Sequence, residues 1–345
     1  ATRSACLSML DSPDDERRIA LVECGGGVSV PTGRLKILFA TDGSQGSAEA
    51  EAYVCALAHS WGASLTVMSV LEFPPGMNPD YAVNRLYLDE LMQEATTRLV
   101  DLKVRAGGLG LPVQSRIATG VPSEEVLAVA RAEEADLVVV GTRGKTGLEH
   151  VLLGSTAERI IRMAPCPVLT VPAAKQRAGE RLKATVTKML VPVDFSDCSL
   201  DALEYGALIA QRSKTSLKLF HVLEPVSYGL DFTLPHMAQR ESSKIAITKR
   251  LSDFVSALTS LGLVSDFLIS GGLPADSILD AARAQSVDVI VMGTHGRRGV
   301  SHALFGSVAE SVLRRSSCPV LTVRSPKLPP DHRRVLSEQS MPANV

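Results

Sequence analysis

Two glycine-rich segments carry the residue pattern with the clearest chemical meaning. The first runs from Gly141 to Gly144, and nine residues later a Gly-Ser-Thr tripeptide begins at Gly154. The apolar runs on either side, 136–140 and 166–171, are typical of strands buried on both faces. The residues after the tripeptide have helical spacing. A loop between a strand and a helix N-terminus directs backbone N–H groups at an anion, most often a phosphate, so the pattern indicates a phosphate-binding loop.

The same arrangement occurs again 152 positions further along the chain. Gly293, Gly296 and Gly306 stand where this offset places the counterparts of the first three glycines. Asp42 and Asp194, which follow the first apolar run of each half, keep the same offset. An offset that holds through loops as well as strands indicates an internal duplication.

Length and composition fit two units of ordinary domain size. The chain has 345 residues, of which 45% are hydrophobic but only 4% aromatic, so Val, Leu, Ile and Ala must fill the cores, as in parallel α/β sheets. The formal net charge of −1 gives no electrostatic footprint for nucleic acid or an anionic membrane, and neither is expected as a partner. No apolar run approaches the ~18 residues of a membrane span.

Cysteine usage and the first residues favour the cytoplasm. Six cysteines without a CxxC pair or a metal-ligand spacing are typical of reduced thiols. Acidic residues stand near the N-terminus where a signal peptide would be basic and then apolar. Cys166 and Cys318 each open a buried strand and are interpreted as core thiols rather than redox groups. His150 and His302 should line the loop surface rather than bind metal, and His221 should lie in the core or the crevice.

Alternating strand and helix patterns predict an α/β fold in both halves, a doubly wound parallel sheet with helices on both faces. In the first half we predict strands at 35–41, 64–70, 112–118, 136–140 and 166–171, and helices at 48–60, 83–106, 123–134 and 157–162. In the second half the order repeats from 187, with a helix at 200–212, a strand at 217–223, a loop at 225–235 and a long helix that ends near 261. The predicted divisions are an N-terminal extension at 1–34, unit one at 35–172, a linker at 173–186, unit two at 187–324 and a C-terminal tail at 325–345.

The predicted fold brings the aspartates and the glycine loops together. A doubly wound sheet binds its ligand at the carboxyl ends of strands where the chain order reverses, which lies between strands one and four in a flavodoxin-like order. Asp42 and Asp194 at strand one suit a ribose hydroxyl or a base amine, although both could instead be helix-start caps. Ser155 and Ser307 offer a hydroxyl to a terminal phosphate or to the ligand shell of a metal. Basic residues beside the loops add positive charge: Arg143, Lys145, His295, Arg297 and Arg298. Together these features predict a nucleotide site in each unit.

Two better-known phosphate motifs are excluded. Gly144-Lys145-Thr146 ends like a Walker A loop, but that motif requires a glycine where Val139 stands. The second copy has two arginines in place of Lys145 and Thr146, so the lysine is not the shared feature. No GxGxxG follows the first strand of either unit, which argues against a dinucleotide site.

The pattern Gly-x2-Gly-x9-Gly-Ser, with an aspartate after strand one and a Cys-Pro-Val-Leu-Thr-Val ending, resembles the universal stress protein family, in its tandem, ATP-binding form. The resemblance covers about 35–172 and 187–324. It implies two tandem five-stranded parallel sheets of strand order 3-2-1-4-5, flavodoxin-like or adenine nucleotide alpha hydrolase-like, with ATP and Mg²⁺ in each crevice. It also implies that the units pair through strand five as an internal pseudo-dimer, and it leaves a homodimer and a protein partner open.

Carried over residue by residue, the resemblance places adenine near the strand-one aspartate and a valine of strand two, and the phosphates at the glycine loop. In unit one the candidate residues are Thr41, Asp42, Val70, Gly141, Thr142, Gly144, Gly154, Ser155 and Thr156. In unit two they are Val193, Asp194, Val222, Gly293, Thr294, Gly296, Gly306, Ser307 and Val308. Ala40 stands where unit two has the more family-like Pro192, and Arg143 replaces the usual histidine, which puts equal affinity of the two sites in doubt.

Three functional hypotheses follow. The first is a cytosolic stress-response regulator that binds ATP and changes how its surface meets partners. The second is slow ATP hydrolysis or phosphoryl transfer in the same crevices, which needs a residue to position the attacking group. The third is a protein-interaction module that does not depend on nucleotide. The sequence does not distinguish ATP from other adenine nucleotides.

Overall fold

A computed structural model describes residues 34–72, 81–142, 153–172, 185–223, 234–296 and 305–324. Unit one contains β1(Lys36–Thr41), α2(Gln45–Ser60), β2(Ser64–Leu71), α3(Ala82–Gly107), β3(Val113–Thr119), α4(Pro122–Ala132), β4(Leu137–Gly141), α5(Ser155–Met163) and β5(Val168–Val171). Unit two repeats this order as β6(Lys188–Pro192), α6(Asp197–Ser213), β7(Ser216–Leu223), α7(Leu234–Ser260), β8(Ser265–Gly271), α8(Pro274–Ala284), β9(Val289–Gly293), α9(Ser307–Arg315) and β10(Val320–Val323). Apart from residues 34, 185 and 186, the predicted extension, linker and tail lie outside the described residues.

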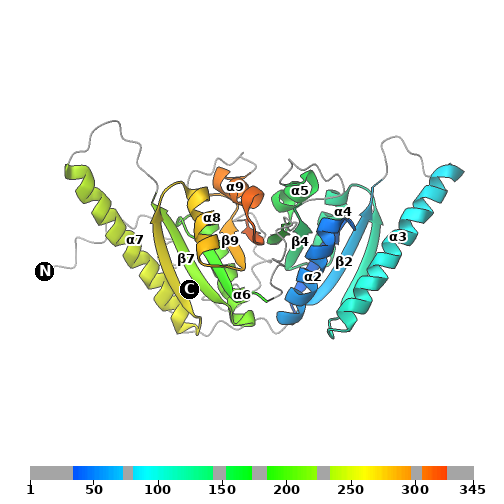
Figure 1. The fold of residues 1–345 in the computed structure, drawn as a ribbon, viewed down its shortest axis with the longest axis horizontal. Helices are drawn as coiled ribbons and strands as arrows, with labels where there is room; N and C mark the ends of the chain where they lie inside the picture. The colour runs from blue at the N-terminus through cyan, green and yellow to red at the C-terminus, as the bar shows by residue number, and fades with distance from the viewer. Residues whose placement is uncertain are drawn as a thin grey trace, which may run out of the picture.

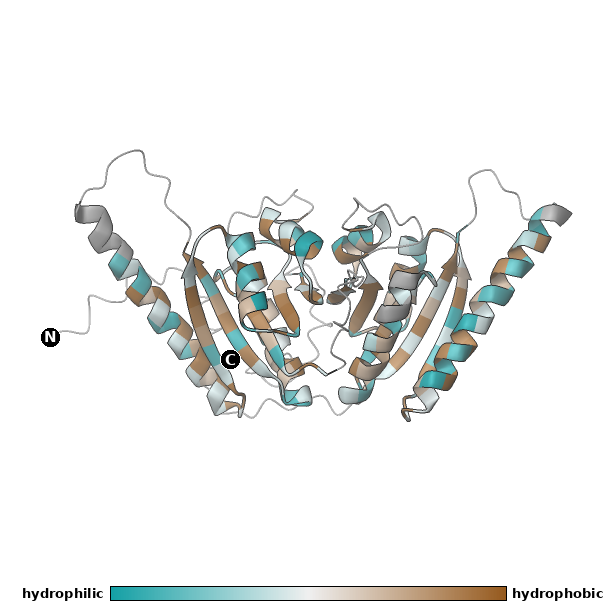
Figure 2. Cartoon of the chain, viewed as in Figure 1, coloured by the Kyte–Doolittle hydropathy of each residue, from teal (hydrophilic) through white to brown (hydrophobic). Residues whose placement is uncertain are grey.

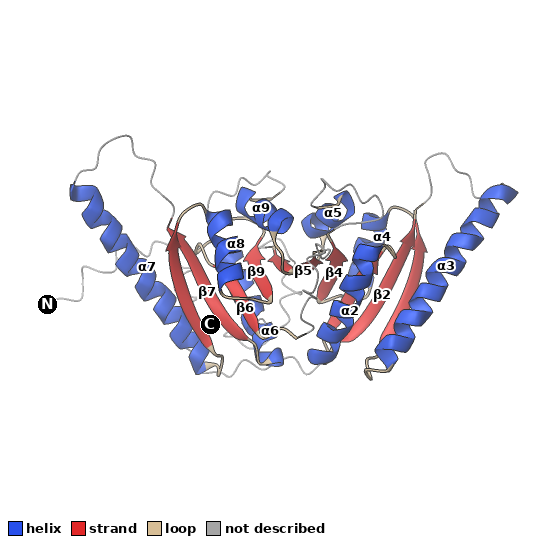
Figure 3. Ribbon diagram, in the orientation of Figure 1, coloured by secondary structure: helices blue, strands red, loops and turns tan. Residues whose placement is uncertain are grey.

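The predicted fold class is confirmed. Within each unit all strand pairs are parallel, and the strand order is β3-β2-β1-β4-β5 in unit one and β8-β7-β6-β9-β10 in unit two, which is the predicted 3-2-1-4-5. The reversal of chain order therefore falls between β1 and β4 and between β6 and β9. Figure 3 shows the red strands of each unit between blue helices.

The central strands of each sheet are buried on both faces because they carry apolar side chains at almost every position, whereas the outer strands β3 and β8 are partly exposed. Along β1, Ile37 and Phe39 join the core layer under α2 and α3, while Leu38 between them joins the layer under α4 and α5. The four residues Leu137–Val140 of β4 are all buried, as a central parallel strand requires. Figure 2 shows this as brown strands beneath helices of mixed colour.

The two units join edge to edge into one ten-stranded sheet. β5 and β10 pair antiparallel, with Leu169 opposite Leu321. Thr170 Oγ1 donates to Val320 O and Thr322 Oγ1 to Val168 O, both at 3.1 Å. Figure 1 shows the resulting arrangement, with the long helices α3 and α7 at opposite outer ends.

Turn chemistry repeats with the fold. Gly120 and Gly272 both have a positive φ, 147° and 136°, which glycine adopts readily. Pro122 and Pro274 then begin α4 and α8, where a missing N–H costs nothing. The predicted loop 225–235 ends too late, since α7 already begins at Leu234 and includes Pro235 in its first turn. No helix in the described part of the chain combines the length and the apolar composition that crossing a bilayer requires.

Candidate functional site

An aspartate holds the turn after the first strand of each unit. Asp42 Oδ1 accepts a hydrogen bond from Ser44 N–H at 2.9 Å, and Asp194 Oδ1 accepts one from Ser196 N–H at 3.0 Å. The N-caps of α2 and α6 are these serines, whose Oγ atoms each accept from the N–H three residues later. The alternative that the aspartates are the helix N-caps is therefore wrong. One oxygen of each carboxylate instead accepts a hydrogen bond within the turn that precedes the helix.

The two ends of each glycine loop are hydrogen-bonded to each other through the threonine that follows the strand. Thr142 N–H donates to the carbonyl of the last β5 residue at 3.0 Å, and Thr142 O accepts from Gly154 N–H at 2.9 Å. In unit two, Thr294 makes both bonds, with the last β10 residue at 3.0 Å and with Gly306 N–H at 2.9 Å. These bonds fix the N-termini of α5 and α9 at the carboxyl ends of β4 and β9.

The two helices at the glycine loops begin without side-chain caps, because their N-cap residues are Gly154 and Gly306. The N–H groups of a first helical turn have no partner within the helix, and the helix dipole places partial positive charge there. Ser155 and Ser307, the first helical residues, are exposed. This contrasts with the serine-capped α2 and α6, and it leaves two helix ends suited to an anion.

In unit two the aspartate and the glycine loop meet. A Cβ built on Gly296 would lie 2.6 Å from Asp194 Oδ2, so a side chain there would collide with the carboxylate. A Cβ on Gly306 would lie 3.3 Å from Thr294 O, tighter than most real contacts. The structure thus brings together four of the predicted residues of unit two at the carboxyl ends of β6 and β9: Asp194, Thr294, Gly296 and Gly306. Gly144, the counterpart of Gly296, falls in 143–152, outside the described residues.

Two other predicted glycines, Gly293 and Gly154, differ in how closely the protein packs around them. A Cβ on Gly293 would lie 2.8 Å from the carbonyl carbon and oxygen of Cys198, so the first turn of α6 already requires glycine there. A Cβ on Gly154 would lie 3.6 Å from Thr142 O, which is ordinary van der Waals contact. The glycine pattern therefore records protein packing as well as any room for phosphate.

The remaining predicted residues lie around the same strand ends. Gly141 ends β4, and Thr142 and Thr294 are buried directly after β4 and β9. Thr41 and Val193, at the ends of β1 and β6, are also buried. The other four are partly buried or exposed: Val70, Val222 and Val308 pack half-buried against the core layer of α4, α5, α8 and α9, and Thr156 is exposed.

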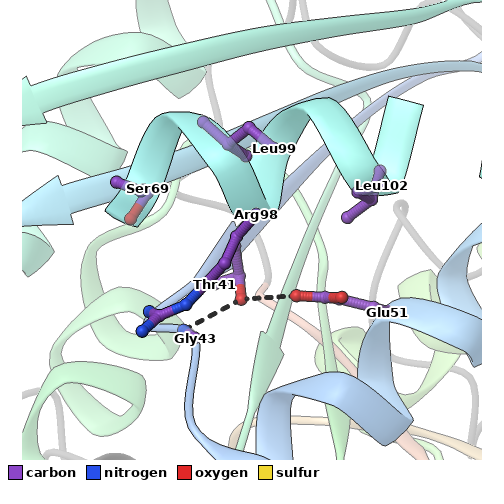
Figure 4. A pocket seen from close by; sticks show the side chains of 8 residues that line it. Thr41, Gly43, Glu51, Ser69, Arg98, Leu99 and Leu102 are labelled. Carbon is purple, nitrogen blue, oxygen red and sulfur yellow. Dashed lines mark hydrogen bonds between the residues drawn. The ribbon is translucent and has the colours of Figure 1, made fainter. Parts of the chain in front are cut away.

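A small cavity of about 10 Å³ in unit one, lined by residues of β1, β2, α2 and α3, was not anticipated from the sequence. Thr41 Oγ1 donates to Glu51 Oε1 at 3.1 Å and accepts from Gly43 N–H at 3.3 Å. Glu51 Oε2 lies 3.2 Å from Arg105 Nη2, and the Arg98 guanidinium covers Gly43. Figure 4 shows Thr41, Glu51 and Arg98 converging from β1, α2 and α3.

In unit two, an aromatic and an apolar residue stand where unit one has Gly43 and Glu51. At the same offset of 152, Phe195 stands for Gly43 and Leu203 for Glu51. The Phe195 ring lies 5.1 Å from the His221 ring and 6.1 Å from the Phe254 ring between centroids, with Arg250 4.4 Å above it. Aligning the two halves would have revealed these differences, but not their contacts.

The interpretation of two other side-chain types agrees with their surroundings. Burial raises the pKa of the Cys166 thiol to about 12 and also raises that of Cys318, so both remain protonated, as core thiols do. His221 is buried, and its Nδ1 lies 2.6 Å from Val193 O. His150 and His302 lie outside the described residues. Within those ranges no group of three or more His, Cys, Asp or Glu could hold a metal ion.

Comparison with known proteins gives the same division of the chain. The model of the universal stress protein family matches residues 33–172 and 185–324. Universal stress protein MJ0531 of Methanocaldococcus jannaschii is 37% identical over 142 residues, which is 41% of this chain and 84% of that protein. Universal stress protein Rv2005c of Mycobacterium tuberculosis is 27% identical over 301 residues, 82% of this chain and 95% of that protein.

A solved structure supports the fold over both units. The universal stress protein of Archaeoglobus fulgidus has a TM-score of 0.63 and 23% identity, and the match covers 84% of this chain and 96% of that one. Because the family model spans nearly all the described residues in two copies, this chain belongs to the universal stress protein family as a tandem of two family domains.

Proposed function

We propose that each unit binds an adenine nucleotide, ATP with Mg²⁺, at the carboxyl ends of β1 and β4 and of β6 and β9, and that binding regulates how the protein meets its partners. The observation that carries the proposal is the pair of glycine-capped helix N-termini, α5 and α9, fixed beside an aspartate turn at the reversal of strand order. Partial positive charge and first-turn N–H groups suit the phosphates. The carboxylates of Asp42 and Asp194 suit the ribose hydroxyls.

The residues also fit a phosphate-bound Mg²⁺. Mg²⁺ usually keeps several waters and binds through substrate phosphates rather than through an all-protein cage. The exposed hydroxyls of Ser155 and Ser307 at the helix starts are the groups of this chain that would join its ligand shell. The ion would neutralise phosphate charge when bound.

We further infer that the two units act as an internal pseudo-dimer in a cytoplasmic protein. Two such chains could also form a homodimer, and the protein could bind a protein partner. The β5–β10 pairing supports the pseudo-dimer, since it couples the two glycine loops through adjacent strands.

The test replaces Ser155 and Ser307 with glutamate, singly and together. A carboxylate at the first position of a helix interacts favourably with the helix dipole, so the fold should be kept. Its negative charge should repel the phosphates. We expect each single variant to lose one Mg-ATP site by calorimetry and the double variant to lose both. Ser252→Glu on the exposed face of α7 adds the same charge elsewhere and should bind like the parent protein.

Unchanged stoichiometry in the double variant would contradict the placement of the site. Following ADP production in the same samples separates the regulator from the slow ATPase, since only the latter turns ATP over. A parent protein that binds no nucleotide would favour the nucleotide-independent interaction module.

A further inference from the structure

Glu51 of unit one is joined to the turn that carries Asp42. The carboxylate Oε1 accepts from Thr41 Oγ1, which in turn accepts from the backbone N–H of Gly43. Gly43 has a φ of 71°, and the Asp42 carboxylate closes the same turn through Ser44 N–H. A short hydrogen-bond chain therefore runs from Glu51 to the backbone beside Asp42 (Figure 4).

The direction of this chain depends on the charge of Glu51. A carboxylate only accepts hydrogen bonds, so the Thr41 hydroxyl must donate to it and turn its lone pairs to Gly43 N–H. A protonated carboxyl group can instead donate to Thr41 Oγ1, which then accepts from both Glu51 and Gly43 N–H and has to turn its own hydrogen away from Glu51. It also loses its charge-assisted bond to Arg105, and such bonds are about twice as strong as neutral ones.

The surroundings of Glu51 favour protonation more than water does. The side chain is only 14% exposed, and burial raises its pKa. The facing charged groups are Arg98 and Arg105 of α3, which oppose the rise, and Asp42 beyond β1, which adds to it. On α2 itself Cys55 is close, and its own pKa is raised by burial and by Glu51.

Unit two has no such chain. Val193 has no hydroxyl, and Leu203 stands in place of the carboxylate. The strand end is joined instead to His221, whose Nδ1 lies 2.6 Å from Val193 O. The Phe195 ring follows the strand and packs against His221, Phe254 and Arg250.

We propose that Glu51 is a positioning residue for the candidate nucleotide site of unit one, and that its protonation weakens nucleotide binding there at mildly acidic pH, while unit two lacks this response. The inference rests on the proposed function. Glu51 acts through Thr41 and the Asp42 turn and does not itself touch the nucleotide.

Stability and binding should respond to Glu51 in opposite directions. A carboxyl group whose pKa is raised in the folded state stabilises the fold below its unfolded pKa, and this contribution is lost as pH rises through the folded pKa. Neutral Glu51→Gln removes the cost of burying charge, so at pH 7.5 it should unfold at the same or a higher temperature than the parent. A residue with a merely structural role would lower both stability and affinity when replaced.

The test isolates each unit. In the Ser307→Glu background only unit one binds, and in the Ser155→Glu background only unit two binds, which controls for titration of the nucleotide itself. Glu51 has its pKa raised from 4.5, so the titration runs from pH 7.5 down to 4.5. Over this range we expect the Mg-ATP affinity of unit one to fall about three- to tenfold more than that of unit two, the range that one net hydrogen bond spans. Glu51→Gln should remove this difference by weakening unit one at pH 7.5.

A ligand-free measurement accompanies the titration. The NMR shift of the Gly43 amide should titrate with pH in the parent and not in Glu51→Gln. Equal pH profiles of the two units, a profile unchanged by Glu51→Gln, or affinity that rises on acidification would overturn the proposal. A rise would mean that loss of negative charge near the phosphates outweighs the turn. If neither unit binds nucleotide at any pH, the proposed function fails, and the positioning role is then decided by the Gly43 titration alone.

Discussion

The crevices of unit one and unit two share a backbone but differ in what supports the strand-one turn. Unit one uses a threonine, a partly buried glutamate and two arginines around a cavity of about 10 Å³. Unit two uses an aromatic cluster around Phe195, whose φ of 64° is the left-handed conformation that Gly43 adopts in unit one. The duplication thus kept the backbone of the turn and one arginine beside it, since Arg250 stands for Arg98, but it replaced the glutamate with Leu203 and the glycine with an aromatic residue. The same turn backbone can therefore be held by two different sets of side chains.

The largest expected effect comes from removing the aromatic support of unit two. Phe195→Ala leaves the left-handed backbone in place but removes a ring in contact with His221, Phe254 and Arg250. We expect a loss of about 2–4 kcal/mol in the free energy of unfolding, somewhat below the cost for a fully buried phenylalanine. Chemical denaturation measures it.

Gly43→Ala is the matched change in unit one. It should cost about 1–2 kcal/mol from the left-handed backbone, because the Arg98 side chain it meets can move away. If Gly43→Ala lowers the free energy of unfolding as much as Phe195→Ala, the side chains around the unit-one turn move aside no more easily than those of unit two.

An effect smaller than that of Phe195→Ala is expected at Gly293, where α6 packs against the end of β9. Gly293→Ala places a Cβ against the Cys198 backbone, which cannot move without shifting the helix. Overpacking of this kind costs about 1–3 kcal/mol. Gly154→Ala, whose Cβ meets only ordinary contact, should cost less than half as much. Equal melting temperatures for the two variants would show that the contact at Gly293 relaxes freely.

The smallest expected effect is the difference in stability between variants of two tyrosines at the junction of the units. Tyr205 OH donates to Asp136 O of the other unit at 2.8 Å, whereas the buried Tyr53 OH, its counterpart by offset, has no hydrogen-bond partner among the described residues. Tyr205→Phe should cost about 1 kcal/mol, and Tyr53→Phe should be neutral or stabilising, because it removes an unpaired buried hydroxyl.

Denaturation of both tyrosine variants measures the difference. Equal losses would indicate that the two hydroxyls are equally bonded in solution and that the junction is symmetric.

The positions of the strands and the repeat could be predicted because they follow from local patterns, whereas the strand order was implied by the resemblance to a known family. Apolar β-branched runs such as 136–140 identify buried strands, and a constant offset then makes each half a check on the other. The turns at Gly120 and Gly272 followed the same logic, since glycine and proline constrain the backbone directly. Pro235 misled the prediction because proline is also favoured in the first turn of a helix.

The support behind strand one could not be predicted, because it depends on residues far apart in sequence. Glu51 reaches Thr41 and Arg105 only after α2 and α3 have packed on the sheet. A positive φ at Phe195 contradicts the usual preference of aromatic residues, and only its packing makes it tolerable. The placement of the candidate nucleotide residues stays a prediction, although the structure brings Asp194, Gly296 and Gly306 together.

The antiparallel junction between β5 and β10 has a consequence for concentration. Because one chain supplies both strands, their association is intramolecular, with an effective concentration on the order of millimolar for a short tether. Dilution that would dissociate two separate subunits leaves this junction intact. The two crevices therefore stay in a fixed one-to-one ratio at any abundance of the protein.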